Sequence, residues 1–154
     1  MAKIYHKFTI ETPASAVYPL LTTVEGLQKW WMKDSRGTPE EVNGEIEFGD
    51  KSTYYNKMKV ISHEKDKKVV WQVLESVGPM PEAEAWNKTT IEIELEEKQL
   101  ARLGGKTATI VLFKHSGFPQ GSEDTKPFAE ANFYWAYSLL GLKNVAEGKE
   151  GFPM

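Results

Sequence analysis

The sequence predicts an α+β domain in which a curved, six-stranded antiparallel sheet surrounds one long C-terminal helix, with two short helices after the first strand. Upstream of residue 116, the chain consists mainly of stretches that alternate apolar and polar side chains at the strand period. Downstream, apolar residues recur at steps of four, three and three, as on one helix face: Trp135, Leu139, Leu142 and Val145. A sheet that covers such a helix can leave a ligand-sized apolar cavity between the two layers.

The first strand is predicted at residues 3–11, because apolar and polar side chains alternate there. Its alternation directs three side chains toward the core: Ile4, Phe8 and Ile10. We expect the first short helix to use Thr12 as its N-cap and Pro13 as its first residue, where the missing N–H of proline costs nothing. Its buried stripe is expected to contain Val17, Leu20 and Leu21. The second short helix is expected from about Val24 to Trp30-Trp31.

Strand periodicity returns at Ile46 and Phe48, after the turn residues Asn43-Gly44. Further strands are expected at residues 53–62, 69–75, 89–96 and 107–115, with an interruption at Pro79-Met80-Pro81. The strand at 89–96 carries glutamates on one face, which we expect to face water. The strand at 107–115 is apolar on both faces, so we expect it inside the sheet or covered on its outer side.

Consecutive strands are expected to pair as an antiparallel meander. The terminal helix is expected from Phe128 to about Lys149, across the concave face of the sheet. We expect this helix to be the largest stabilising element, anchored by Trp135, and we expect the shorter helix that ends at Trp31 to matter less.

Composition excludes several classes of protein. The 154 residues have the size of one ordinary domain, and 40% apolar with 27% charged residues is typical of a folded soluble chain. A net charge of −3 provides no field for nucleic acid. No apolar stretch approaches the roughly 20 residues that span a bilayer, and no signal-peptide core is present near the start. Together with the absence of cysteine, these features predict a cytoplasmic protein without membrane insertion.

Several local motifs occur in the same order and spacing as in a known superfamily. They are Pro13 and Val17, Trp30-Trp31, Gly44-Glu45-Ile46-Glu47-Phe48, Trp71, His115-Ser116-Gly117-Phe118, and Trp135-x3-Leu139-x2-Leu142-Lys143. In this layout the chain resembles the START-like helix-grip superfamily (SRPBCC), and most of all its branch of homologues of the activator of heat-shock-protein ATPase. The resemblance covers residues 3 to about 149 and implies a helix-grip fold, with residues 1–154 forming a single START-like domain. One departure is the turn Lys65-Asp66-Lys67-Lys68, where the family often has prolines.

The aromatic residues are the strongest functional signal. Five tryptophans, seven phenylalanines and six tyrosines can supply rigid apolar walls, and their N–H and O–H groups can orient a ligand. Core packing is the competing explanation and is the usual one in a typical fold. In a helix-grip fold, however, we expect some of them to line a cavity between the sheet and the terminal helix: Phe48, Trp71, Trp86, Phe113, His115, Trp135 and Leu139.

Residues suited to catalysis or metal binding are few. His6, His63 and His115 lie on three different predicted strands, and no HExxH motif or cysteine is present, so we expect no metal and no cofactor. His115 is either a polar group in the cavity or a strand-end histidine bonded to backbone or solvent. An enzyme would have to use His115 together with a tyrosine, the candidates being Tyr54, Tyr55, Tyr134 and Tyr137.

The sequence therefore favours binding of a small hydrophobic or lipid-like ligand between sheet and helix. One alternative is a regulator of a chaperone ATPase that acts by protein interaction, as the resemblance implies. The other is a cyclase-like or hydrolytic enzyme that uses His115. The expected partner is a small hydrophobic ligand, with a chaperone as the alternative, and the identity of the ligand and the oligomeric state stay open.

Overall fold

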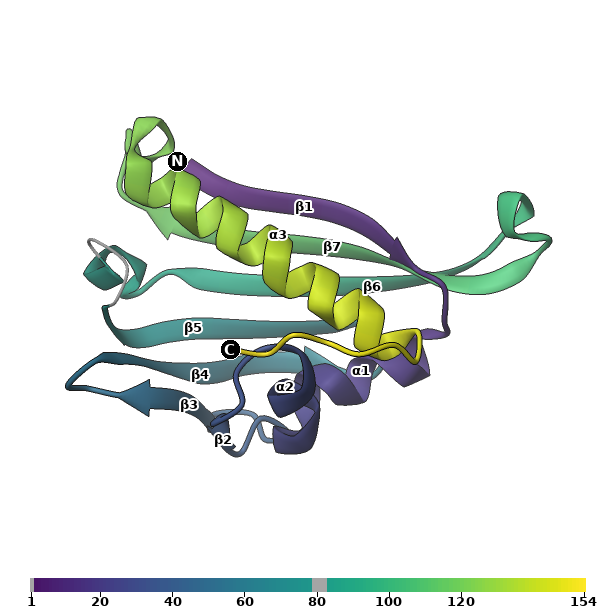
Figure 1. Ribbon diagram of the computed structural model, residues 1–154, viewed down its shortest axis with the longest axis horizontal. Helices are drawn as coiled ribbons and strands as arrows, with labels where there is room; N and C mark the ends of the chain where they lie inside the picture. Colours follow the sequence, from purple (N-terminus) through teal and green to yellow (C-terminus); the bar gives the residue numbers. More distant parts are fainter. Residues whose placement is uncertain (1, 79–82) are drawn as a thin grey trace.

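Helix α3 (Lys126–Ala146) lies diagonally across one face of a seven-stranded antiparallel sheet, so that helix and sheet form two layers (Figure 1). This computed structural model describes residues 2–78 and 83–154. The expected interruption at Pro79-Met80-Pro81 lies outside the described residues. The α+β architecture with a long C-terminal helix confirms the predicted fold class.

The strands are β1 (Ala2–Ile10), β2 (Arg36–Gly37), β3 (Glu45–Asp50), β4 (Tyr54–Glu64), β5 (Lys68–Val77), β6 (Thr90–Leu100) and β7 (Lys106–Phe118). The other helices are α1 (Ala14–Thr22) and α2 (Val24–Trp30). Three short 3-10 turns complete the elements: η1 (Ala83–Trp86), η2 (Ala101–Leu103) and η3 (Ser122–Asp124).

The order of strands corrects two predictions. The sheet has seven strands rather than six, because the two-residue β2 pairs with β3, and so short a segment carries no alternation that could reveal it. The order is β1-β7-β6-β5-β4-β3-β2, so β2 to β7 form a meander but β1 pairs with β7. The helices α1 and α2 carry the chain from β1 to the opposite edge of the sheet (Figure 1). As a result β7, the strand predicted to be interior, lies between β1 and β6.

The helix ends also differ from the prediction. Pro13, not Thr12, is the N-cap of α1, and it makes no side-chain capping bond. The carbonyl oxygen of Thr12 instead accepts a hydrogen bond from Thr109 Oγ1 at 2.7 Å, which ties this turn to β7. Helix α3 begins earlier than expected, because Thr125 caps it by accepting a hydrogen bond from the backbone N–H of Phe128, and it ends earlier as well, at Ala146.

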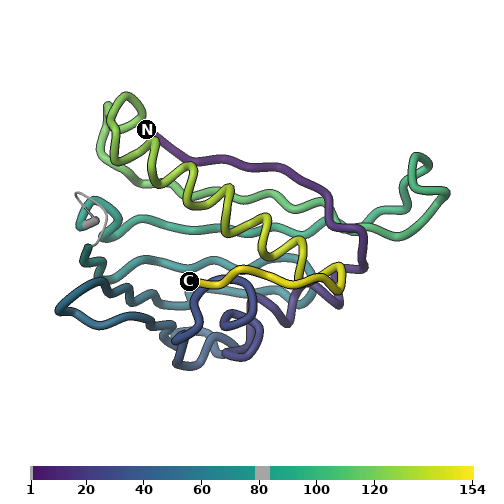
Figure 2. The backbone as a smooth tube through the Cα atoms, viewed as in Figure 1, coloured from purple at the N-terminus to yellow at the C-terminus, as the bar shows by residue number. Residues whose placement is uncertain are grey.

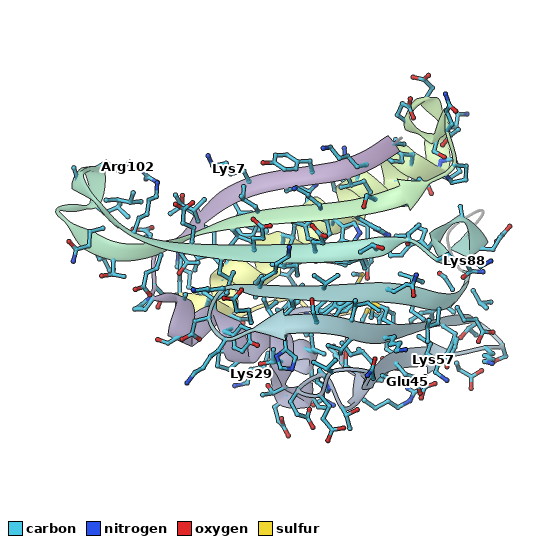
Figure 3. The ribbon with its side chains drawn as sticks, turned by 180° about the vertical axis from the view of Figure 1, so that it is seen from behind. Lys7, Lys29, Glu45, Lys57, Lys88 and Arg102 are labelled. Carbon is cyan, nitrogen blue, oxygen red and sulfur yellow. The ribbon has the colours of Figure 1, made fainter. Side chains whose placement is uncertain are left out.

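The outer face of the sheet, seen in Figure 3, is polar and charged. Glu45 and Lys57, both labelled there, form an ion pair of 3.3 Å between β3 and β4. Lys68 and Glu94 form another, of 3.5 Å, between β5 and β6. On β6 the side chains of Ile91, Ile93 and Leu95 are buried while the alternating glutamates stay partly or fully exposed, which confirms the predicted water-facing side.

Tryptophan rings fill the centre of the space between sheet and α3. Trp31 stacks on Trp71 with ring centroids 5.6 Å apart and planes 4° apart, and it contacts Trp135 at 5.4 Å. Trp30 stacks on Trp31 at 5.6 Å, and Trp86 stacks on Trp135 at 5.9 Å. All five tryptophans thus form one connected cluster, the tryptophan cluster, in which Trp30, Trp31, Trp71 and Trp135 are each at most 1% exposed. Space for a ligand can remain only at the margin of this cluster.

The position of Trp31 changes the expectation that Trp135 contributes more to stability than Trp31. Because Trp31 contacts three other tryptophans and Phe48, we expect Trp31→Ala to destabilise the protein as strongly as Trp135→Ala. Truncation of a buried tryptophan typically costs about 3–5 kcal/mol. Thermal and urea unfolding would measure the loss, with the exposed Tyr5→Ala as control, for which we expect a change within about 0.5 kcal/mol. A Trp31→Ala protein that melts within about one or two degrees of wild type would contradict this role of Trp31.

Candidate functional site

A cavity of about 360 Å³ lies at the margin of the tryptophan cluster, between the end of α2, strands β3 and β4, η1 and helix α3. We call it the margin pocket. Its lining residues are Met32, Phe48, Tyr54, Asn56, Gly78, Trp86, Tyr134 and Met154. The volume falls within the range of small-molecule sites, and most of the wall is aromatic or thioether surface, which is the usual composition of such sites.

The sheet and α3 supply opposite walls of the margin pocket. Phe48 of β3 and Asn56 of β4 are cross-strand partners, so their side chains project from the same face of the sheet. Tyr134 reaches the pocket from α3, where its hydroxyl accepts a hydrogen bond from Trp31 Nε1 at 2.7 Å and points its own proton toward Met32 Sδ at 3.8 Å. The tryptophan cluster therefore also orients this wall of the pocket.

The C-terminal tail supplies a further part of the wall. Figure 2 shows this tail running back from the end of α3 to lie beside the turn that follows α2. Met154 is held there because its N–H donates to the carbonyl oxygen of Trp31 at 3.0 Å and its backbone oxygen accepts from the N–H of Lys33 at 2.8 Å. The ring of Phe152 packs against Tyr137 on the outer side of α3 at 4.5 Å. These contacts place Met154 against the pocket.

Uncharged side chains make up the described lining of the margin pocket. Among the described residues, no charged side chain lines it. Burial raises the pKa of the Tyr134 hydroxyl, and burial together with the nearby Asp34 carboxylate raises the pKa of Tyr54, so both phenols stay protonated at neutral pH. The carboxamide of Asn56 is a further polar group in the wall, and its Oδ1 is buried without a hydrogen-bond partner in the described part of the chain.

The seven residues expected to line a cavity lie in three different places. Phe48 and Trp86 line the margin pocket. Leu139 lines a separate, smaller hollow of about 180 Å³ between β1 and α3. Trp71, Phe113, Trp135 and His115 are fully buried in the packed centre. The prediction rests on inward direction and on matching family positions, and neither separates a packed side chain from one that borders empty space.

Several pocket residues were missed or were expected in another role. The sequence indicates Tyr54 and Tyr134 only as possible hydroxyl partners for His115. Tyr55 faces the opposite side of β4 and bonds Glu47, and Tyr137 lies on the outer side of α3. No pattern in the sequence indicates Met32, Asn56 or Met154 as pocket residues. Asn56 could have been found from its position opposite Phe48, but that position follows from the strand register and not from the sequence.

His115 joins three elements inside the core. Trp135 Nε1 donates to His115 Nδ1 at 3.0 Å, and His115 Nε2 lies 2.8 Å from Thr89 Oγ1. Because Thr89 gives its own proton to the carbonyl oxygen of Trp86, Nε2 carries the imidazole proton and donates it to Thr89. Burial lowers the pKa of His115 to about 3, so the ring is neutral. Both ring nitrogens are occupied by the protein itself, which leaves neither of them to act on a substrate.

Two other features bear on function. A hollow of about 760 Å³ beside the turn at Glu64–Lys68 is lined mainly by charged side chains of both signs, and the ion pairs Lys67–Glu64 and Lys68–Glu94 lie there. Its charged lining distinguishes it from the margin pocket. Within residues 2–78 and 83–154, no three histidine, aspartate or glutamate side chains are grouped so that they could hold a metal ion. The helices described are too short or too polar to cross a membrane.

Residues 11–147 match the family described as Activator of Hsp90 ATPase homolog 1-like protein. Among solved structures, the Aha1 dimer from Colwellia psychrerythraea is 33% identical, with 96% of this chain and 97% of that chain covered and a TM-score of 0.74. A protein from Mesorhizobium loti is 12% identical over 97% of this chain and 99% of its own, with a TM-score of 0.72. At that identity the likeness concerns the fold alone. No curated protein sequence matches.

The buried neutral state of His115 predicts a pH-dependent stability. Its folded pKa of about 3 lies below the unfolded value of 6.5, so its contribution is complete above about pH 6.5 and is lost as the pH falls toward 3. We expect the free energy of unfolding to fall by up to about 1.4 kcal/mol per pH unit in that window. Urea unfolding between about pH 7 and 5, above the titration of most carboxyl groups, would measure this slope.

The matched variant is His115→Gln, which keeps hydrogen-bonding groups but does not titrate. We expect it to be less stable than wild type at neutral pH and to show a shallower dependence on pH. Equal slopes in the two proteins would show that His115 takes up a proton as readily in the folded protein as in the unfolded one.

Proposed function

This chain belongs to the Activator of Hsp90 ATPase homolog 1-like family, and within that family we propose that it binds a small, uncharged, largely apolar molecule in the margin pocket. The observation that carries this proposal is the pocket itself. About 360 Å³ of space remains beside an otherwise tightly packed core, and it is bordered by Phe48, Trp86, Tyr134 and two methionines. Methionine side chains adapt their shape readily, which suits a wall that closes around different ligands.

The uncharged side chains of the lining restrict the ligand. A carboxylate group would lose its hydration there without gaining an opposite charge from the side chains described in the lining, and burial of an unpaired charge is costly. Fatty acids in their ionised form are therefore poor candidates, whereas alcohols, phenols and other neutral molecules fit. The fully occupied nitrogens of His115 support binding rather than acid–base catalysis, because the histidine that the sequence indicates for catalysis has no free nitrogen to offer.

A matched pair of ligands tests the proposal. We expect 1-decanol to bind and decanoate, which has the same number of carbons, to bind much more weakly. Burial of each methylene contributes about 0.8 kcal/mol, so after the costs of association a Kd between about micromolar and millimolar is expected for the alcohol. Isothermal titration calorimetry would measure both, and quenching of tryptophan fluorescence would provide a second signal because Trp86 lines the pocket.

Filling the pocket provides the control. Asn56→Phe directs a larger side chain into the pocket and should abolish binding of decanol. Lys57→Phe, on the next residue of the same strand, places the same side chain on the outer face and should leave binding unchanged. Binding that survives Asn56→Phe would place the ligand elsewhere, and no binding of either compound by wild type would count against the proposal.

A second candidate function is protein docking, and helix α3 favours it. Its outer side carries an apolar stripe formed by Phe133, Tyr137 and Leu140, which are 71%, 42% and 50% exposed. No charged residue occurs between Ala131 and Leu142, so the helix is apolar on both its inner and outer sides. Such a helix is normally covered on all sides. Because the Colwellia relative is a dimer, we propose that a second copy of this chain covers the stripe, with the same patch used by both copies.

Sedimentation velocity tests the proposed self-association. We expect wild type to dimerise and Phe133→Glu to stay monomeric, since the charge would be buried unpaired in the interface. Leu74→Glu, an exposed apolar position on β5, should dimerise like wild type. A wild type that stays monomeric would contradict self-association, and it would leave the stripe to a different protein, for which family membership suggests a chaperone.

A further inference from the structure

We infer that the molecule bound in the margin pocket carries a hydrogen-bond donor, a hydroxyl or a neutral N–H group, which the carboxamide of Asn56 recognises. The inference rests on the proposed binding function and specifies the chemical class of the ligand: a compact apolar body, no formal charge and one donor. Hydroxylated aromatic or alicyclic molecules and indoles belong to this class.

The position of Asn56 is unusual for a polar side chain. It lies on the interior strand β4, opposite Phe48 on one side and Ser76 on the other, and its side chain enters a wall that otherwise consists mainly of aromatic and thioether groups. Its Oδ1 is shielded from water and has no partner among the described residues. An unpaired buried acceptor costs the full desolvation of that group, so the folded protein loses stability at this position unless a ligand supplies a donor.

The other unpaired polar atoms do not share this location. They are His6 Nε2, Trp71 Nε1 and Ser138 Oγ, and none of these residues lines the margin pocket. Tyr134, which does line it, already has its hydroxyl engaged by Trp31 and Met32. Asn56 therefore combines an unpaired polar atom with a place in the pocket wall. Rotation about its terminal torsion, which is broad and roughly two-fold, can turn the oxygen toward a ligand.

A site built to form a hydrogen bond discriminates strongly against an analogue that lacks the matching group, because the protein atom is then left unpaired. Removing the unpaired protein atom should accordingly remove the discrimination. Replacing Asn56 by leucine removes the unpaired oxygen while keeping a similar volume, so the variant should be more stable than wild type but should lose its preference for a donor. A purely structural asparagine would show the opposite change in stability.

Three naphthalenes of similar size separate the possible contacts: 2-naphthol offers a donor and an acceptor, 2-methoxynaphthalene only an acceptor, and 2-methylnaphthalene neither. We expect calorimetric titration of wild type to give a Kd for 2-naphthol about tenfold lower than for either analogue. In Asn56→Leu we expect the three values to converge, with 2-methylnaphthalene still bound and the melting temperature raised.

The remaining outcomes count against the donor requirement alone or against both proposals. Equal binding of 2-naphthol and 2-methylnaphthalene by wild type overturns the donor requirement but leaves the pocket as a binding site. Equal binding of 2-naphthol and 2-methoxynaphthalene, both tighter than 2-methylnaphthalene, shows that Asn56 donates rather than accepts and also overturns it. If wild type binds none of the three, the proposed function fails and the inference fails with it. The comparison in wild type does not depend on whether Asn56→Leu folds.

Discussion

Close packing of five tryptophan rings between the sheet and α3 is the constraint on which the rest of the structure depends. Trp31 lies at the centre of the cluster, in contact with Trp30, Trp71 and Trp135. The large rigid rings fix the separation of helix and sheet, because protein interiors pack to near crystal density and leave few voids. The same residue also orients Tyr134 through its ring N–H and holds the C-terminal tail through its carbonyl oxygen. Trp31 thus holds together both the core and one wall of the margin pocket.

Polar groups near this core fall into two kinds. His115 is buried and completely satisfied by Trp135 and Thr89, so it stabilises the junction of β7, η1 and α3 as a neutral ring. Asn56 is buried in part and left with an unpaired oxygen in a pocket wall. The first arrangement is what a folded protein needs from a core histidine. The unpaired oxygen of Asn56 lowers the stability of the isolated chain, and no contact within the described residues compensates for it. Such local conflicts are expected where a residue serves a function.

Helix α3 connects the two surfaces that the structure offers to other molecules. Its inner side carries Tyr134 to the margin pocket, while the next residue toward the N-terminus, Phe133, belongs to the exposed apolar stripe. The C-terminal tail touches both as well, because Phe152 packs on Tyr137 and Met154 borders the pocket. Family membership accounts for the architecture of this helix and sheet. It does not by itself choose between a small ligand and a protein partner, since each depends on side chains particular to a chain.

The sequence by itself determined the features that arise from local periodicity. Alternation placed Ile91, Ile93 and Leu95 inside and the glutamates of β6 outside, and the spacing of Trp135, Leu139 and Leu142 predicted the buried face of α3. Tertiary structure decided the rest, because it depends on contacts between residues far apart in the chain. Pairing of β1 with β7, the short β2 and the opposition of Asn56 to Phe48 are matters of register, which periodicity does not specify. Strand alternation likewise predicts that both Trp71 and Phe48 point inward. Only the packing of the aromatic rings in three dimensions buries Trp71 completely and places Phe48 at the edge of a cavity.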